Sequence, residues 1–99
     1  MARRLPPILE ALDPSVRDLA ALGVAVRNAR GRSQLRIDDA AAFCGVSADL
    51  LSRLENGRPV TTDRLLKVLA GMGLDLLVVS RTQAWDLQAA QNPASQVTE

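Results

Sequence analysis

Histidine is absent from this sequence of 99 residues, and cysteine occurs once, at Cys44. A zinc site of the Cys/His type, a histidine-based catalytic triad and an intrachain disulfide are therefore excluded. Phe43 and Trp85 are the only aromatic residues, so the core must be built from Leu, Val, Ala and Ile. The chain also lacks an apolar run of membrane-spanning length and an N-terminal signal-peptide pattern. We expect one small cytoplasmic binding domain, without metal or cofactor, rather than an enzyme.

The net charge is also small, at +1, but the charged residues are unevenly distributed along the chain. Residues 1–36 hold seven Arg against three acids, whereas residues 37–99 hold five basic residues against eight acids. Such a basic first third suits an anionic partner. The alternative is a solvated, Arg-rich helix face.

Helix-start and helix-stop residues divide the middle of the chain into four predicted helices. Asp13-Pro14-Ser15 is typical of a helix start, and the first helix then extends to about Arg30. Thr61 or Thr62 caps the fourth helix, which extends to Ala70. Apolar spacing predicts the buried stripe of the first helix, which consists of Val16, Leu19, Leu22 (or Gly23) and Val26.

The two middle helices are predicted over 37–44 and 48–55. Gly45-Val46-Ser47 forms the turn between them, Ser47 caps the second of them, and Asn56-Gly57-Arg58-Pro59 ends it. Two helices joined by a tight glycine turn have the spacing of a DNA-binding helix-turn-helix. One face of the second helix is apolar and becomes buried, which leaves short polar residues on the face that can enter a major groove.

Residues 74–80 have a different composition, rich in Leu and Val directly after a glycine, which favours a strand. A lone strand cannot satisfy its backbone, so we predict antiparallel pairing with the same strand of a second copy. The alternative is a fifth short helix packed on the core. Residues 81–99 are predicted to be a polar flexible tail with a weak helix over 82–91. The predicted dimer strand contributes Leu74, Leu76, Leu77, Val78 and Val79.

Over about Leu22 to Leu76 the sequence resembles the XRE, or lambda-repressor-like, helix-turn-helix family. The motifs that carry the resemblance are Leu22-Gly23-x-x-Val26-Arg27-x-x-Arg30, Ala41-x-x-Cys44-Gly45-Val46-Ser47 and Leu51-Ser52-Arg53-Leu54-Glu55-Asn56-Gly57. The segment that follows is most similar to HipB-type antitoxins, which dimerise through a C-terminal strand and repress their own operon. The resemblance implies an all-α bundle within 13–80, with one β-strand paired across a homodimer at the bacterial nucleoid. Residues 1–12 are expected to form an arm, because Pro6-Pro7 prevents a helix from running through them.

The resemblance also implies roles for individual residues. Arg53 is expected to read a base, because a guanidinium can grip O6 and N7 of guanine; the alternative is contact with phosphate only. A buried salt bridge is expected between Arg30 and Glu55. The remaining groove-facing positions are Ser47, Ala48, Asp49 and Ser52, of which Asp49 has the alternative role of stabilising the start of its helix. DNA backbone contacts are expected at Arg32, Arg36, Asn56, Arg58, Thr61 and Thr62.

Two departures from the family pattern reduce the expected affinity for DNA. Ile37 stands where the family usually has Gln, and Arg36 replaces the usual polar cap. With Asp38 and Asp39 nearby, these residues predict moderate affinity with steep salt dependence.

The sequence therefore predicts a homodimeric, sequence-specific repressor that is the autoregulating antitoxin of a toxin–antitoxin operon. Its partners are operator double-stranded DNA and a HipA-like toxin kinase. The alternative is a protein-interaction adaptor on the same scaffold that neutralises a partner without strong DNA binding. Trp85 is a candidate anchor for the protein partner, or else packs on the core or the dimer interface.

Overall fold

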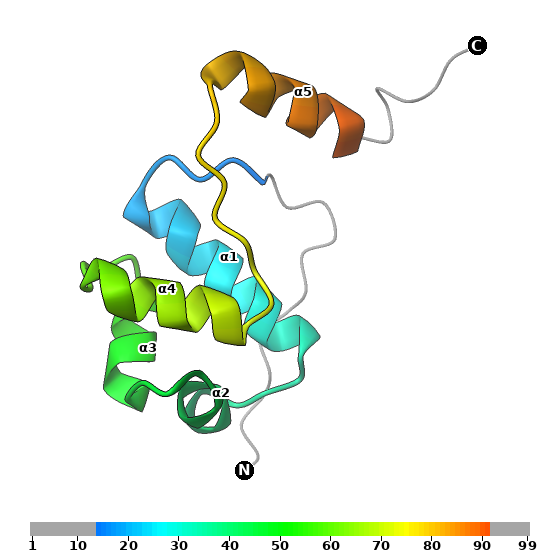
Figure 1. Cartoon of the computed structure of the whole chain (residues 1–99). Coiled ribbons are helices and arrows are strands. Elements are labelled where there is room, and N and C mark those ends of the chain that lie inside the picture. Colours follow the sequence, from blue (N-terminus) through cyan, green and yellow to red (C-terminus); the bar gives the residue numbers. More distant parts are fainter. Residues whose placement is uncertain (1–13, 92–99) are drawn as a thin grey trace.

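The computed structural model describes residues 14–91, which form five helices and no strand. The helices are α1 (Leu19–Arg32), α2 (Ile37–Cys44), α3 (Ala48–Glu55), α4 (Thr62–Gly71) and α5 (Arg81–Gln91). Figure 1 shows α1–α4 gathered into a bundle, with α5 at the far end of a long connecting segment. The predicted arm over 1–12 lies outside the described residues. No helix within residues 14–91 has the length and apolar character needed to span a bilayer.

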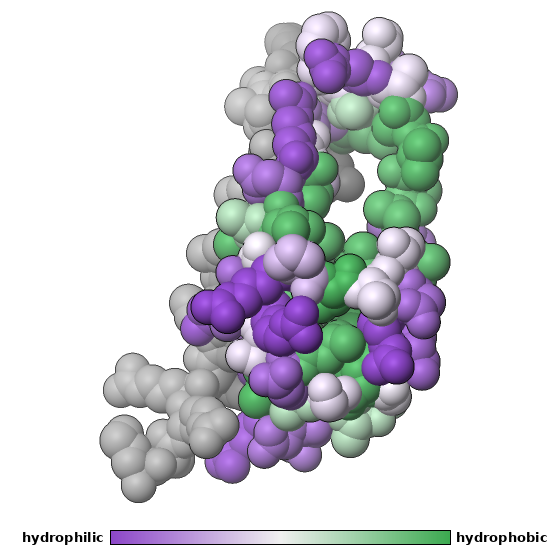
Figure 2. All heavy atoms as spheres, turned by 90° about the vertical axis from the view of Figure 1, so that its left-hand side faces the viewer, coloured by the Kyte–Doolittle hydropathy of each residue, from purple (hydrophilic) through white to green (hydrophobic). Residues whose placement is uncertain are grey.

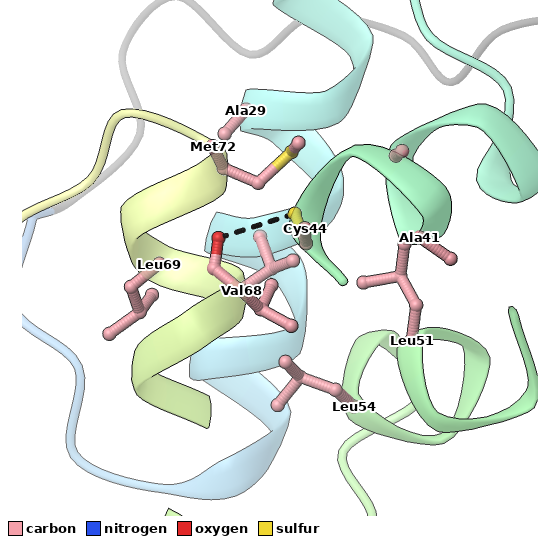
Figure 3. Close-up of a cluster of buried hydrophobic side chains, with 10 residues drawn as sticks. Ala29, Ala41, Cys44, Leu51, Leu54, Val68, Leu69 and Met72 are labelled. Carbon is pink, nitrogen blue, oxygen red and sulfur yellow. Dashed lines mark hydrogen bonds between the residues drawn. The ribbon is translucent and has the colours of Figure 1, made fainter. Parts of the chain in front are cut away.

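The core lies where α1, α2, α3 and α4 meet. Val26, Leu51, Leu54 and Val68 are its largest fully buried side chains. Figure 3 shows Leu51, Leu54 and Val68 pointing into the space between the helices. The remaining buried apolar side chains are Ala29, Ala40, Ala41, Cys44, Leu69 and Met72. Neither aromatic residue takes part, since Phe43 is 71% exposed and Trp85 is 57% exposed.

Small residues allow the helices to approach closely. A Cβ atom on Gly23 would lie 2.5 Å from the carbonyl oxygen of Glu55, so α1 can meet the end of α3 only with a glycine there. A Cβ atom on Gly71 would overlap the Sγ of Cys44. The glycine therefore allows α4 to approach α2 just as closely. These two contacts hold α1 against α3 and α4 against α2.

α1 differs from its prediction at both ends. It begins at Leu19, because Asp18 caps it: the backbone N–H of Ala21 donates to Asp18 Oδ1 at 2.8 Å. It continues to Arg32 rather than ending at about Arg30. The predicted buried stripe was wrong in its first half, since Val16 and Leu19 are each more than 40% exposed. The packed part of α1 begins at Leu22, where α3 first covers it.

The first four helices end in the same way. After each, a residue in the left-handed region lets the chain close two backbone hydrogen bonds that satisfy the last carbonyls. The bounds predicted for α2 and α3 are confirmed. α4 begins after Thr61, one of its two predicted caps, and ends at Gly71, one residue beyond the predicted Ala70. The left-handed residues are Gln34, Gly45, Gly57 and Gly73.

Residues 74–80 form neither the predicted strand nor the alternative helix within the single chain. Leu74 packs on the core, whereas Leu77 is 64% and Val78 93% exposed. Figure 2 shows this segment as an apolar band along one edge of the molecule. Among the described residues, no backbone hydrogen bond involves residues 75–79. Because a strand requires a second strand to bond with, pairing between two copies stays a prediction.

α5 begins one residue before the weak helix expected over 82–91. Ser80 and Gln83 form a capping box: the Gln83 N–H donates to Ser80 Oγ at 3.2 Å, and the Ser80 N–H donates to Gln83 Oε1 at 3.1 Å. Trp85 is exposed on this helix, so it does not pack on the core of its own chain.

Candidate nucleic-acid interface

The turn between α2 and α3 is built on Gly45. Its φ of +76° is left-handed, and the N–H groups of Gly45 and Val46 donate to carbonyls of Ala42 and Ala41 at 3.2 and 3.0 Å. These bonds close the end of α2 and redirect the chain within three residues. The chain then enters α3 at Ser47, whose hydroxyl accepts from the Leu50 N–H at 3.0 Å. The helix-turn-helix geometry is thus fixed by local backbone bonds.

α3 has one buried face and one accessible face. Leu51 and Leu54 are at most 1% exposed and anchor the helix in the core. Of the five residues predicted to read bases, Ser47, Asp49 and Arg53 are exposed and Ser52 is half-buried. Ala48 is also half-buried, but it packs against the core. The structure therefore leaves four of the five predicted base-reading residues accessible on α3 and its cap, and Ala48 is the exception.

Arg53 lies on this surface with a defined orientation. Its Nη2 donates to the carbonyl oxygen of Pro59 at 3.0 Å, in the loop between α3 and α4. This bond uses one of its five N–H donors, so four stay available for a bidentate contact. Asn56, in contrast, donates its side-chain amide back to the carbonyl of Ser52 at 2.7 Å, and so closes the end of α3.

Arg30 and Glu55 form a buried, bidentate ion pair. Arg30 Nε lies 2.6 Å from Glu55 Oε2, and Nη2 lies 2.9 Å from Oε1. Nη1 of the same guanidinium donates to the carbonyl of Leu35 at 3.1 Å. Arg30 therefore ties the end of α1 to the end of α3 and to the segment before α2. Its side chain is only 10% exposed, and its guanidinium binds groups of its own chain.

The residues predicted to contact the DNA backbone flank α3 on the surface. All six are exposed: Arg32, Arg36, Asn56, Arg58, Thr61 and Thr62. Arg36 occupies the N-cap position of α2 and Thr61 that of α4, and neither caps its helix with a side-chain hydrogen bond. The structure thus leaves the three arginines of this set at the surface, with Arg32 and Arg36 before α2 and Arg58 after α3 in the sequence.

Aspartates occupy the first turns of the helices around this surface. Asp38 and Asp39 lie in the first turn of α2, Asp49 in that of α3 and Asp63 in that of α4. The Thr61 hydroxyl donates to the Asp63 carboxylate, and this hydrogen bond holds the pKa of Asp63 below its usual value. A phosphate at the start of α4 therefore has to share the helix dipole with a carboxylate.

A protein-family model described as a helix-turn-helix domain matches residues 21–82, more than half of the chain. The chain belongs to this helix-turn-helix domain family. The match runs from the first turn of α1 to the beginning of α5. No curated protein matches the chain. Because a helix-turn-helix places its second helix in the major groove, membership indicates a DNA-binding regulator.

One residue of this helix-turn-helix domain was missed by sequence reasoning. Lys67 on α4 donates from Nζ to the carbonyl oxygen of Gly45 at 3.3 Å, so the only lysine supports the turn. A cation at the end of α2 also complements the helix dipole. The sequence around Lys67 does not indicate this contact, because Lys67 and Gly45 are 22 positions apart.

The interior of the helix-turn-helix domain offers no reactive group. Cys44 is buried, its Sγ lies 3.7 Å from the carbonyl oxygen of Val68 (Figure 3), and burial raises the pKa of the thiol. Within residues 14–91, no group of three or more His, Cys, Asp or Glu side chains is placed to hold a metal ion.

Proposed function

We propose that this protein is a sequence-specific DNA-binding transcriptional repressor that acts as a homodimer. The observation that carries the proposal is the accessible face of α3. Short polar side chains and one oriented arginine project from a helix whose opposite face is anchored by Leu51 and Leu54. A major groove admits a helix of this kind, and small side chains at its N-terminus allow close approach to base edges.

The flanking charges support docking on the DNA backbone. Arg32 and Arg36 precede α2, and Arg58 follows α3, and all three arginines are exposed. Contacts to phosphates position a protein on the duplex without carrying sequence information. Arg30 takes no part in this set, because Glu55 and Leu35 occupy its guanidinium.

The connecting segment supports the proposed dimer. Leu76, Leu77 and Val78 are 59–93% exposed, a large apolar run for a single chain. The backbone of residues 75–79 makes no hydrogen bond among the described residues. An antiparallel strand from a second copy would cover these apolar side chains and bond to this backbone.

We further propose that the protein is the antitoxin of a toxin–antitoxin operon with a HipA-like kinase as toxin. The resemblance to HipB-type antitoxins motivates this proposal. Trp85 supports it, because an exposed Trp, with the exposed Leu87 on the same helix, is suited to anchor a partner protein. A HipA-like kinase encoded by the neighbouring gene that co-purifies with the chain is the expected finding; a neighbour with no affinity for it contradicts the antitoxin role.

A second candidate function, a protein-interaction adaptor, is favoured by one observation. The first turns of α2, α3 and α4 all carry aspartate, and these turns surround the face that would meet phosphates. Such carboxylates weaken DNA binding by repulsion. In this role the same scaffold holds a partner protein and leaves DNA free.

Binding of the wild-type protein to labelled duplexes that tile the DNA upstream of its gene tests the proposal. We expect one tile to bind in the presence of random competitor DNA. With Arg32, Arg36 and Arg58 from both protomers, about six phosphate contacts form, so affinity falls roughly a thousandfold between about 50 and 200 mM salt. Equal affinity for all tiles overturns sequence specificity. No binding at low salt, together with capture of a protein partner, establishes the adaptor instead.

A further inference from the structure

We infer that Asp49 and Arg53 act as a pair that selects a half-site containing a cytosine and a guanine within about two base pairs of each other. Asp49 is the cytosine-selecting residue. This inference rests on the proposed DNA-binding function and specifies the bases that the same surface recognises.

The two side chains are adjacent on the accessible face of α3 yet do not pair. They are four positions apart, which is about 6 Å along a helix. Opposite charges at this spacing ordinarily attract each other across one turn. Here the Arg53 guanidinium instead donates to the Pro59 carbonyl, and Asp49 makes no ion pair or hydrogen bond through its side chain with any described residue. The carboxylate and the guanidinium are therefore both available to a ligand.

Base chemistry assigns a different partner to each charge. In the major groove, guanine presents two acceptors, N7 and O6, which suit Arg53. Cytosine presents the N4 amino donor, which suits the carboxylate of Asp49. Adenine also offers an amino donor, but its adjacent N7 acceptor repels a carboxylate, and thymine offers only the O4 acceptor and a methyl group. An unpaired aspartate on this face consequently favours cytosine over the other three bases.

The distance between the two residues sets the spacing of the bases. Base pairs are stacked about 3.4 Å apart, so a separation of about 6 Å along α3 covers about two steps. Charge repulsion from phosphates makes Asp49 costly for DNA in general. The cost is offset only where the N4 amino group of a cytosine can donate to the carboxylate. Asp49 therefore weakens binding to all other sequences.

Selection of bound duplexes from a random library, followed by affinity measurements on single-base variants, tests the inference. Wild type is compared with Asp49→Asn, and with Asp39→Asn as a control that removes a first-turn carboxylate from α2. Both aspartates are exposed, and thermal melting of each variant verifies that it folds. Arg53→Ala, assayed in parallel, locates the guanine.

Wild type should select a cytosine within two base pairs of that guanine, with about a tenfold loss when the cytosine is replaced. Asp49→Asn should move the preference at this one position toward adenine, because an amide pairs with N6 and N7. Asp39→Asn should raise affinity for all sequences alike. An unchanged selected sequence with Asp49→Asn, or a uniform gain like that of the control, overturns the inference while leaving DNA binding intact. Absence of any selected sequence with wild type overturns the proposed function itself.

Discussion

Arg30 grips Glu55 through two hydrogen bonds, of 2.6 and 2.9 Å, although 25 positions separate them in the sequence. The pair joins the end of α1 to the end of α3, with side chains only 10% and 5% exposed. Because α3 carries the proposed base-reading residues, this pair sets the angle at which they are presented.

Removal of one member of the pair should cost more than removal of both. Arg30→Met or Glu55→Leu alone leaves an uncompensated buried charge, and each should lower the free energy of unfolding by about 3–5 kcal/mol. The double variant leaves no charge unpaired, so its loss should be smaller than that of either single variant. Urea unfolding of all four proteins measures the coupling. Additive losses would show that the two side chains act independently.

Gln34 is the one non-glycine residue with positive φ in the part of the chain that the structure describes, at +58°. Gln34→Gly relieves the steric cost of a Cβ in this region, which outweighs the added entropy of the unfolded chain. We expect a gain of about 0.5–1 kcal/mol and a melting temperature a few degrees higher. Gln34→Ala, which keeps the Cβ, is the matched control. Equal melting temperatures for the two variants would contradict the assignment of strain.

Cys44 predicts a pH dependence of stability on the alkaline side. Burial raises the pKa of its thiol above the usual 9.0. Below pH 9 the thiol is neutral in both states, whereas above it the unfolded chain ionises first and folding loses stability. Urea midpoints between about pH 8 and 10 should fall more steeply for wild type than for Cys44→Ala. If the urea midpoints of the two proteins fall in parallel with pH, groups other than Cys44 control the loss of stability at alkaline pH.

Val78→Pro tests the proposed dimer with little risk to the monomer. Val78 is 93% exposed and its backbone makes no hydrogen bond among the described residues, so the bundle should keep its melting behaviour at low concentration. Proline cannot donate to a strand ladder, so sedimentation should change from dimer to monomer. Val78→Thr keeps a β-branched residue and should remain dimeric. A proline variant that still sediments as a dimer places the interface elsewhere.

The bounds of α2 and α3 could be predicted because local chemistry determines them. Gly45 permits the left-handed turn, Ser47 caps α3, and Gly57 with Pro59 ends it. The predicted start of α1 was wrong because the sequence offers two aspartates that could cap the helix, at positions 13 and 18. Asp13 before a proline matches the general pattern, yet Asp18 caps the helix that packs on α3.

Features that depend on tertiary contacts could not be predicted from the residues alone. The salt bridge of Arg30 followed from the resemblance to a family rather than from spacing. The bond from Arg53 to Pro59 depends on how the loop before α4 folds back, and the bond from Lys67 to Gly45 on how α4 crosses α2. The segment over 74–80 has the composition of a strand, but a single chain provides no partner strand for it.

The affinity of Arg53→Ala for the upstream tile that wild type prefers tests the central claim most directly. Arg81→Ala, at the start of α5 and not on α2 or α3, is the matched control. Arg53 is exposed, so the variant should melt like wild type while losing roughly 10- to 100-fold in specific affinity. The control should bind within about twofold of wild type, because an exposed arginine on α5 is not among the predicted DNA contacts. Unchanged affinity of Arg53→Ala for that tile would contradict the assignment of α3 as the DNA-reading helix.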